Sequence, residues 1–321
     1  MFVQRHTVTT GDGWSLELQR GLRPGRPIGR PVLFVPGFGM NSFIFRYHPR
    51  GGSFMEWLLD AGLDPWSVDL RGQTSSRSDT RKHADVTLEE HANADLPAIF
   101  DFISGETGHE RVHAIGCSLG GALLYAYAGM FSDHRIDRLV TMGTPLRWVE
   151  TSPLISAFAA ISPAIRAPMK GSRRAAKLAL PIATRLAPEA LMIYLNPSLT
   201  FTTPVSQLVR TVEDPQPGIS RQLGQWIKNK DLQLGDLNVT ESLKSFTRPL
   251  LVVAGNGDRI CPSGSALIAA KLAGGPTSSM LIGSRHEQVA HADLFIADIA
   301  PERIYRPISG WLTDAEPHSD R

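Results

Sequence analysis

The sequence GCSLG, residues 116–120, stands between a short apolar run, residues 112–116, and a helical pattern over residues 119–131. Glycines two positions before and after the serine remove side chains that would collide in a tight strand-to-helix turn. In such a turn the serine holds a strained backbone, and its hydroxyl projects above the sheet near N–H groups at the start of the helix. An ordinary glycine–serine loop has the same spacing, but the flanking strand and helix favour Ser118 as a nucleophile.

The same succession of apolar run and helical pattern continues along most of the chain. Residues 2–20 alternate in polarity and turn at residues 11–13, which predicts a β-hairpin. Strand-like runs cover residues 31–37, 65–72, 112–116, 136–142, 249–254 and 279–282, and helical patterns cover residues 53–63, 87–103, 119–131, 263–273 and 301–312. Short apolar strands that alternate with helices predict an α/β fold with a mostly parallel central sheet and helices on both faces.

Residues 146–246 break this alternation with a helical pattern that is rich in Ala, Leu and Arg and interrupted by prolines. An insertion of this kind predicts a helical cap over the strand ends, so that residues 1–145 and 247–315 form the core domain. Basic residues are scattered along the apolar part of the cap, namely Arg166, Lys170, Arg173, Arg174, Lys177 and Arg185. Two interpretations stay open: a lid that contacts a lipid surface transiently, and a packed cap with solvated basic groups.

A serine hydroxyl needs a base to take its proton, and the base needs a carboxylate to orient it. After an elbow of this type the acid follows a late strand and the histidine comes after it in the chain. Asp258 stands in a glycine-rich loop directly after a strand-like run, where a turn-stabilising aspartate is the alternative. Two histidines follow the last strand-like run, and His291 is favoured over His286 because an apolar helical pattern begins directly after it. The predicted catalytic residues are therefore Ser118, Asp258 and His291.

An oxyanion formed by attack of the serine needs backbone donors close to it. The N–H groups of Phe38 and Leu119 are the expected pair, because Phe38 follows the first central strand-like run. Gly37 and Gly39 allow the backbone to come close, although a plain glycine turn has the same composition. The residues that we assign to the substrate pocket are Gly37, Gly39, Met40 and Cys117.

Cys117 directly precedes the predicted nucleophile, and its side chain must face another direction. We expect a small residue that packs below the turn. A redox role or a second nucleophile is the alternative. Nothing in the sequence pairs Cys117 with the other cysteine of the chain, Cys261.

These features together resemble the α/β-hydrolase family over nearly the whole chain outside the cap. The segments DLRGQTSSRSD (69–79) and ADLPAIFDFISGETGHERVHAIGCSLGG (94–121) are similar to segments of the acid lipases, and HADLF (291–295) resembles their catalytic-histidine motif. A weaker resemblance, in PLLVVAGNGD (249–258), is to the synthases that polymerise hydroxyalkanoates. The resemblance implies an α/β-hydrolase fold and a serine carboxylic-ester hydrolase.

The chain departs from the acid lipases at two positions near the predicted site. The lipases have His-Gly at the oxyanion loop, where this chain has Pro36-Gly37, and a histidine before the serine, where it has Cys117. A backbone donor survives the first change, but the pocket wall differs. The identity of the substrate is therefore not carried over.

Composition excludes several classes of function. The 321 residues are 42% hydrophobic and 20% charged, which is typical of a globular chain. The formal net charge is +2 with no long basic block, so nucleic acid is not an expected partner. Two cysteines and an N-terminal stretch without an apolar signal-like core favour a cytoplasmic protein. No metal or organic cofactor is expected, and the oligomeric state stays open.

The leading hypothesis is hydrolysis of carboxylic esters with hydrophobic acyl groups through an acyl-enzyme on Ser118. An acyltransferase would use the same residues, with an alcohol or thiol in place of water. A protein that binds an apolar ligand without turnover is the third hypothesis. Partition of the acyl-enzyme between water and added alcohol distinguishes the hydrolase from the acyltransferase. Absence of turnover on any ester favours the ligand-binding protein.

Overall fold

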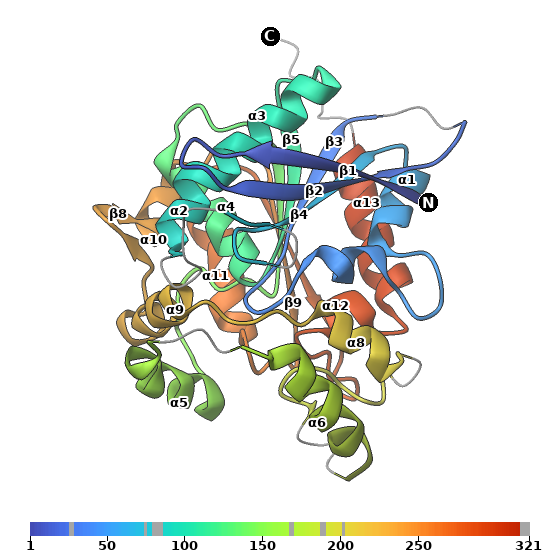
Figure 1. The fold of residues 1–321 in the computed structure, drawn as a ribbon, viewed down its shortest axis with the longest axis vertical. Helices are drawn as coiled ribbons and strands as arrows, with labels where there is room; N and C mark the ends of the chain where they lie inside the picture. Colours follow the sequence, from blue (N-terminus) through green and yellow to red (C-terminus); the bar gives the residue numbers. More distant parts are fainter. Residues whose placement is uncertain are drawn as a thin grey trace.

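The computed structural model describes residues 1–25, 29–73, 76–78, 86–166, 170–186, 191–200 and 203–314. Within these residues eight strands form one sheet in the order β1-β2-β4-β3-β5-β6-β9-β10 (Figure 1). The strands are β1 (Phe2–Thr9), β2 (Ser15–Leu22), β3 (Pro31–Val35), β4 (Asp64–Asp69), β5 (Val112–Cys117), β6 (Ile136–Met142), β9 (Leu250–Gly255) and β10 (Thr277–Ile282). The β2 strand is antiparallel to both neighbours, and every pairing from β4 to β10 is parallel. The predicted α/β fold and the predicted N-terminal hairpin are confirmed.

The central strands are buried on both faces, because alternate side chains enter two separate hydrophobic cores. In β3, Leu33 and Val35 join one core, whereas Val32 and Phe34 join the other. Four consecutive apolar residues are therefore needed in so short a strand. This explains why the central strands appear in the sequence as continuous apolar runs.

Helices cover both faces of the sheet. The helices of the described residues are α1 (Phe54–Asp60), α2 (Leu88–Glu90), α3 (Leu96–Thr107), α4 (Leu119–Met130), α5 (Pro153–Ile161), α6 (Ser172–Leu186), α8 (Val205–Thr211), α9 (Pro217–Asn229), α10 (Val239–Ser242), α11 (Ser263–Leu272), α12 (Asp293–Ile296) and α13 (Arg306–Thr313). Helices α3, α4 and α11 belong to one core, and α1, α12 and α13 to the other (Figure 1). The helix predicted over residues 301–312 begins with a π-helical turn, Pro301–Tyr305, and continues as α13.

The segment predicted as a cap carries α5, α6, α8 and α9, which lie toward the lower end of the view in Figure 1. Its last part packs on the core, because Val239, Leu243 and Phe246 join the hydrophobic cluster that contains α4, a cluster that also includes residues of α5 and α9. A short hairpin, β7 (Gln233–Leu234) with β8 (Leu237–Asn238), precedes them. The exact domain boundaries stay a prediction, and the predicted end at residue 315 lies outside the described residues.

None of the helices in the described part of the chain combines the length and the apolar character that a bilayer span requires.

Candidate active site

Ser118 occupies the turn between β5 and α4 with φ 51° and ψ −119°, a conformation that few residues other than glycine adopt. Its N–H donates to the carbonyl oxygen of Met142 at 2.9 Å, which ties the turn to the end of β6. A Cβ on Gly116 would collide with the backbone of Gly121, and one on Gly120 with the carbonyl of Val35. The GCSLG spacing thus has the physical cause predicted from the sequence: strand and helix are too close for side chains beside the serine.

His291 and Asp258 form a buried pair: the Nδ1 atom of the histidine lies 2.6 Å from Oδ2 of the aspartate. The other carboxylate oxygen, Oδ1, accepts the backbone N–H groups of Ile260 and Cys261, each at 2.8 Å. The carboxylate is therefore held in place, and its bond to Nδ1 leaves Nε2 of the imidazole for another partner. The rival candidate, His286, lies exposed on a turn.

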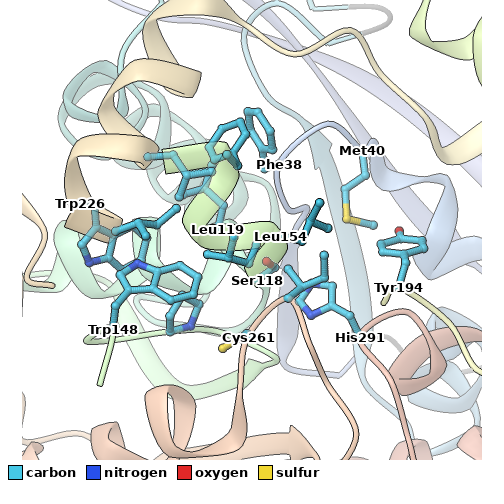
Figure 2. A pocket seen from close by; sticks show the side chains of 16 residues that line it. Phe38, Met40, Ser118, Leu119, Trp148, Leu154, Tyr194, Trp226, Cys261 and His291 are labelled. Atoms are coloured by element: carbon cyan, nitrogen blue, oxygen red, sulfur yellow. The ribbon is translucent and has the colours of Figure 1, made fainter. Parts of the chain in front are cut away.

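The described residues bring the three predicted catalytic side chains to one edge of the sheet. The strands before them, β5, β9 and β10, are parallel, so their carboxyl ends meet at that edge. Ser118 and His291 line the same cavity (Figure 2). Between β6 and the cap, Gly143 has φ +56°, and a Cβ there would lie 3.0 Å from Cε1 of His291. The backbone directly after β6 thus packs against the histidine ring.

The loop after β3 passes directly over the elbow. A Cβ on Gly37 would lie 3.1 Å from the Cβ atom of Ser118, so the loop backbone approaches the serine closely. The carbonyl of Gly39 accepts the N–H of Glu213 at 2.8 Å, and the N–H of Asn41 donates to the carbonyl of Thr211 at 3.0 Å. Residues after α8 therefore fix the loop that carries the predicted donor of Phe38.

A cavity of about 290 Å³ extends from the elbow into the cap (Figure 2). Its lining is mostly apolar and consists of Phe38, Met40, Ser118, Leu119, Pro145, Trp148, Leu154, Ile155, Phe158, Tyr194, Leu223, Trp226, Ile227, Ile260, Cys261 and His291. Figure 2 shows Trp148 and Trp226 at one end of this cavity, and Met40 and Tyr194 at the other, with Ser118 between them. The cavity therefore offers two apolar compartments on either side of the serine.

Three residues assigned to the pocket from the sequence do not line this cavity. Gly37 and Gly39 line a much smaller hollow behind the loop, because the peptide they flank turns its Phe38 side chain into the main cavity. Cys117 is buried below the elbow, with its Sγ atom 3.9 Å from Sδ of Met40. Burial also raises the pKa of the Cys117 thiol well above its usual range, which disfavours the thiolate. Met40, the fourth residue assigned to the pocket, lines the cavity.

Most of the remaining residues of the cavity wall come from the cap. The sequence did not identify them individually. Trp148 and Trp226 pack edge to face with ring centroids 5.7 Å apart, and the ring of Tyr194 lies 6.2 Å from that of His291. The tryptophans are separated by 78 positions in the chain, so no local spacing connects them. Only the presence of large apolar side chains in a segment over the strand ends could have indicated them.

Asp293 is a second buried carboxyl, two positions after His291, that sequence analysis left without a role. It accepts the N–H of Ala290 at 2.7 Å and the N–H of Asn196 at 3.0 Å. Burial raises the pKa of Asp293 to about 7. The N–H of Ala292 donates to the carbonyl of Tyr194 at 2.7 Å, so the histidine loop and the cap segment around residue 195 are bonded together.

The two segments with acid-lipase resemblance meet in a buried ion-pair network. Arg71, which is fully buried, lies 2.5 Å from Asp95 and 2.8 Å from Asp12. The same carboxyl of Asp95 contacts Nδ1 of His91 at 2.8 Å. This network joins the hairpin turn, the loop after β4 and the start of α3 behind the oxyanion loop, and it does not enter the main cavity.

Within the described ranges, no three His, Cys, Asp or Glu side chains gather as a metal site would require. The arrangement brings an elbow serine to an apolar cavity that is also lined by the histidine of a buried histidine–aspartate pair. A serine, a histidine and a carboxylate are the groups that nucleophilic acyl transfer uses.

Part of the chain is similar in sequence to known lipases. Over 129 residues the chain is 36% identical to lipase member N from Homo sapiens, a match that covers 36% of this chain and 32% of that protein. It is 32% identical over 136 residues to triacylglycerol lipase 2 from Arabidopsis thaliana, covering 38% of this chain and 32% of that protein. The matches thus span about a third of the length of these relatives.

Solved structures share the fold across nearly the whole chain. A hydrolase from Pseudomonas aeruginosa PA01 superposes with a TM-score of 0.65 at 16% identity, covering 97% of this chain and 99% of that one. A thermophilic esterase from Thermogutta terrifontis superposes with a TM-score of 0.62 at 21% identity, covering 96% and 98%. The family model described as alpha/beta hydrolase fold matches residues 30–293, and the chain belongs to that family.

Proposed function

We propose that the protein is a serine hydrolase of carboxylic esters. The observation that carries the proposal is the buried pair of His291 and Asp258, whose histidine lines the same cavity as Ser118 at a strained elbow. The lipases and the esterase named above support the reaction class.

In the proposed reaction Nε2 of His291 takes the proton of the Ser118 hydroxyl as Oγ attacks the acyl carbonyl carbon. The oxyanion accepts hydrogen bonds from the N–H groups of Phe38 and Leu119, and Asp258 stabilises the imidazolium. His291 then returns the proton to the leaving alcohol as the ester bond breaks. A water that gives its proton to His291 attacks the acyl-enzyme, and the acid leaves while Ser118 regains its proton.

The wall of the cavity supports a hydrophobic substrate. Aromatic and aliphatic side chains surround the serine on both sides, so an acyl chain or an apolar alcohol is desolvated on entry. We also propose that the cap meets a lipid surface transiently, because α6 exposes apolar side chains beside basic ones. Both cysteines are free thiols, which favours the reducing cytoplasm predicted from composition.

Steady-state hydrolysis of p-nitrophenyl esters of increasing chain length tests the proposal. Ser118→Ala and His291→Ala are expected to lower kcat by about 10⁴-fold or more, since each removes one member of a unit. His286→Ala is the matched control and retains wild-type kcat. Equal loss in the two histidine variants would reject the assignment of the base, and preferential acyl transfer to added alcohol would make the protein an acyltransferase.

A further inference from the structure

Helix α6 presents an apolar stripe to solvent. Leu178, Ile182 and Leu186 follow one another at intervals of four, so they lie on one side of the helix. Their exposed fractions are 73%, 60% and 81%. Exposure of three large aliphatic side chains in line is unfavourable in water and marks a contact surface.

A basic groove runs beside this stripe, between α6 and α8. It is a hollow of about 800 Å³ whose cations are Lys170, Arg173, Arg174 and Lys177. Arg173 is paired with Glu213 at 2.7 Å. In the part of the chain that the structure describes, the other three cations have no carboxylate within ion-pair distance.

The two carboxylates of the groove, Glu213 and Asp214, neutralise only part of the positive charge of its four cations. Asp214 is turned to the start of α6, where it accepts the N–H groups of Gly171 at 3.1 Å and Ser172 at 2.7 Å. These bonds and the nearby Arg173 keep the pKa of Asp214 below its usual range. The groove therefore carries an excess of positive charge.

The cavity reaches the surface at the same end of the molecule. Leu154 of α5 lines the cavity and is nearly half exposed, and Ile161 at the end of α5 is 62% exposed. Figure 1 shows α5 and α6 both projecting at the lower end of the view, beyond the core. A surface that covered this end would face the entrance through which a substrate reaches Ser118.

We propose that the α6 surface, defined by the apolar stripe and the basic groove, docks the protein on an anionic lipid bilayer, from which the substrate ester is drawn. The occupant follows from the chemistry: aliphatic side chains enter the boundary between headgroups and acyl chains, while Lys170, Arg174 and Lys177 meet negative headgroups. Hydrolysis of the bound lipid rests on the proposed function. Docking on the bilayer does not require Ser118.

Vesicle co-sedimentation of the full chain tests the docking surface. Wild type is compared on vesicles of phosphatidylcholine alone and of phosphatidylcholine with phosphatidylglycerol. We expect binding to the anionic vesicles to be stronger by about tenfold or more, and to weaken as salt is added. Binding to neither vesicle, or equal binding to both, would overturn the proposal.

Two groups of variants separate the parts of the surface. The combined variant Leu178→Ser, Ile182→Ser and Leu186→Ser is expected to lower binding to both vesicles by about tenfold or more. The combined variant Lys170→Gln, Arg174→Gln and Lys177→Gln is expected to abolish the preference for anionic vesicles.

The matched control is Leu281→Ser, because Leu281 is 54% exposed on the edge strand β10, away from α6. It is expected to bind like wild type, and an equal loss in this variant would overturn the proposal.

All variants are also assayed on a water-soluble p-nitrophenyl ester, where unchanged kcat shows that each is folded. Wild type that binds vesicles but hydrolyses no ester would reject the proposed function and leave docking standing. If the serine variants of the stripe change self-association of the protein and leave vesicle binding unchanged, the stripe is a protein contact and the proposal is overturned.

Discussion

At the scale of the residue, Asp293 is a carboxyl whose ionisation destabilises the folded protein. It is fully buried, accepts backbone N–H groups from Ala290 and Asn196, and has its pKa raised to about 7 by burial. In the unfolded chain its pKa returns to about 4. Between these two values the folded protein binds the extra proton, so this group contributes stability at low pH that is lost as the pH rises through 7.

Asp293→Asn removes this titration. We expect the free energy of unfolding of wild type to fall, relative to that of the variant, by about 1–4 kcal/mol between about pH 4 and pH 8. Urea denaturation of both proteins across this range measures the difference, in which the contributions of titrating groups that do not interact with Asp293 cancel. A constant difference across the range would contradict the account of Asp293.

The absence of a side chain at Gly143 leaves room for the ring of His291. With φ +56° and a hypothetical Cβ 3.0 Å from the His291 ring, alanine there must strain the backbone and displace the imidazole. Gly143→Ala is expected to lower kcat on a soluble ester by about tenfold to a hundredfold. Gly310→Ala is the matched control, since a Cβ on Gly310 meets no atom within 4 Å. Wild-type kcat in Gly143→Ala would show that the ring tolerates the shift.

At the scale of the element, the buried network around Arg71 joins segments that are distant in the chain. Arg71→Met would leave Asp95 buried with His91 as its nearest partner. We expect a loss of about 3–5 kcal/mol in the free energy of unfolding. The pair of Arg135 and Asp101 is exposed, and Arg135→Met is expected to cost less than about 1 kcal/mol. An equal loss in the free energy of unfolding for Arg71→Met and Arg135→Met, measured by chemical denaturation, would contradict the role of the network.

The cap helices set the depth of the apolar compartment. Trp226 on α9 and Trp148 close the end of the cavity that lies away from His291 (Figure 2). Trp226→Leu removes part of this wall, so kcat/KM for esters about four methylenes longer than the wild-type optimum is expected to rise by about tenfold relative to that optimum. An unchanged chain-length profile, measured beside Leu281→Ala as a surface control, would place the acyl chain in the other compartment.

At the scale of the whole molecule, the α/β fold could be predicted because its central strands are buried on both faces. Runs such as that of β3, with Val32 and Phe34 in one core and Leu33 and Val35 in the other, are continuous in sequence. The elbow could be predicted because its glycine spacing lies within five consecutive residues, although the atom that excludes a Cβ at Gly120 is the distant carbonyl oxygen of Val35. Both signals are short in range, and a single sequence contains them in full.

The cavity wall could not be predicted in the same way, because it depends on contacts between distant segments. Trp148 and Trp226 meet only after α9 folds over the strand ends. The burial of Cys117 below the turn, in contrast, was expected from its place directly before Ser118. The ring of His291 approaches Asp258 because β9 and β10 are neighbours. The apolar helical pattern directly after His291 favoured this histidine over His286, but the pairing itself is a property of the sheet.

The most direct test of the central proposal is labelling with a fluorophosphonate, followed by mass spectrometry of the peptides. The account predicts one adduct on Ser118 in wild type and in His286→Ala, a labelling rate lower by about a hundredfold or more in His291→Ala, and no adduct in Ser118→Ala. An adduct on another residue, or no adduct on wild type while the protein is folded, would contradict the assignment of Ser118 as an activated nucleophile.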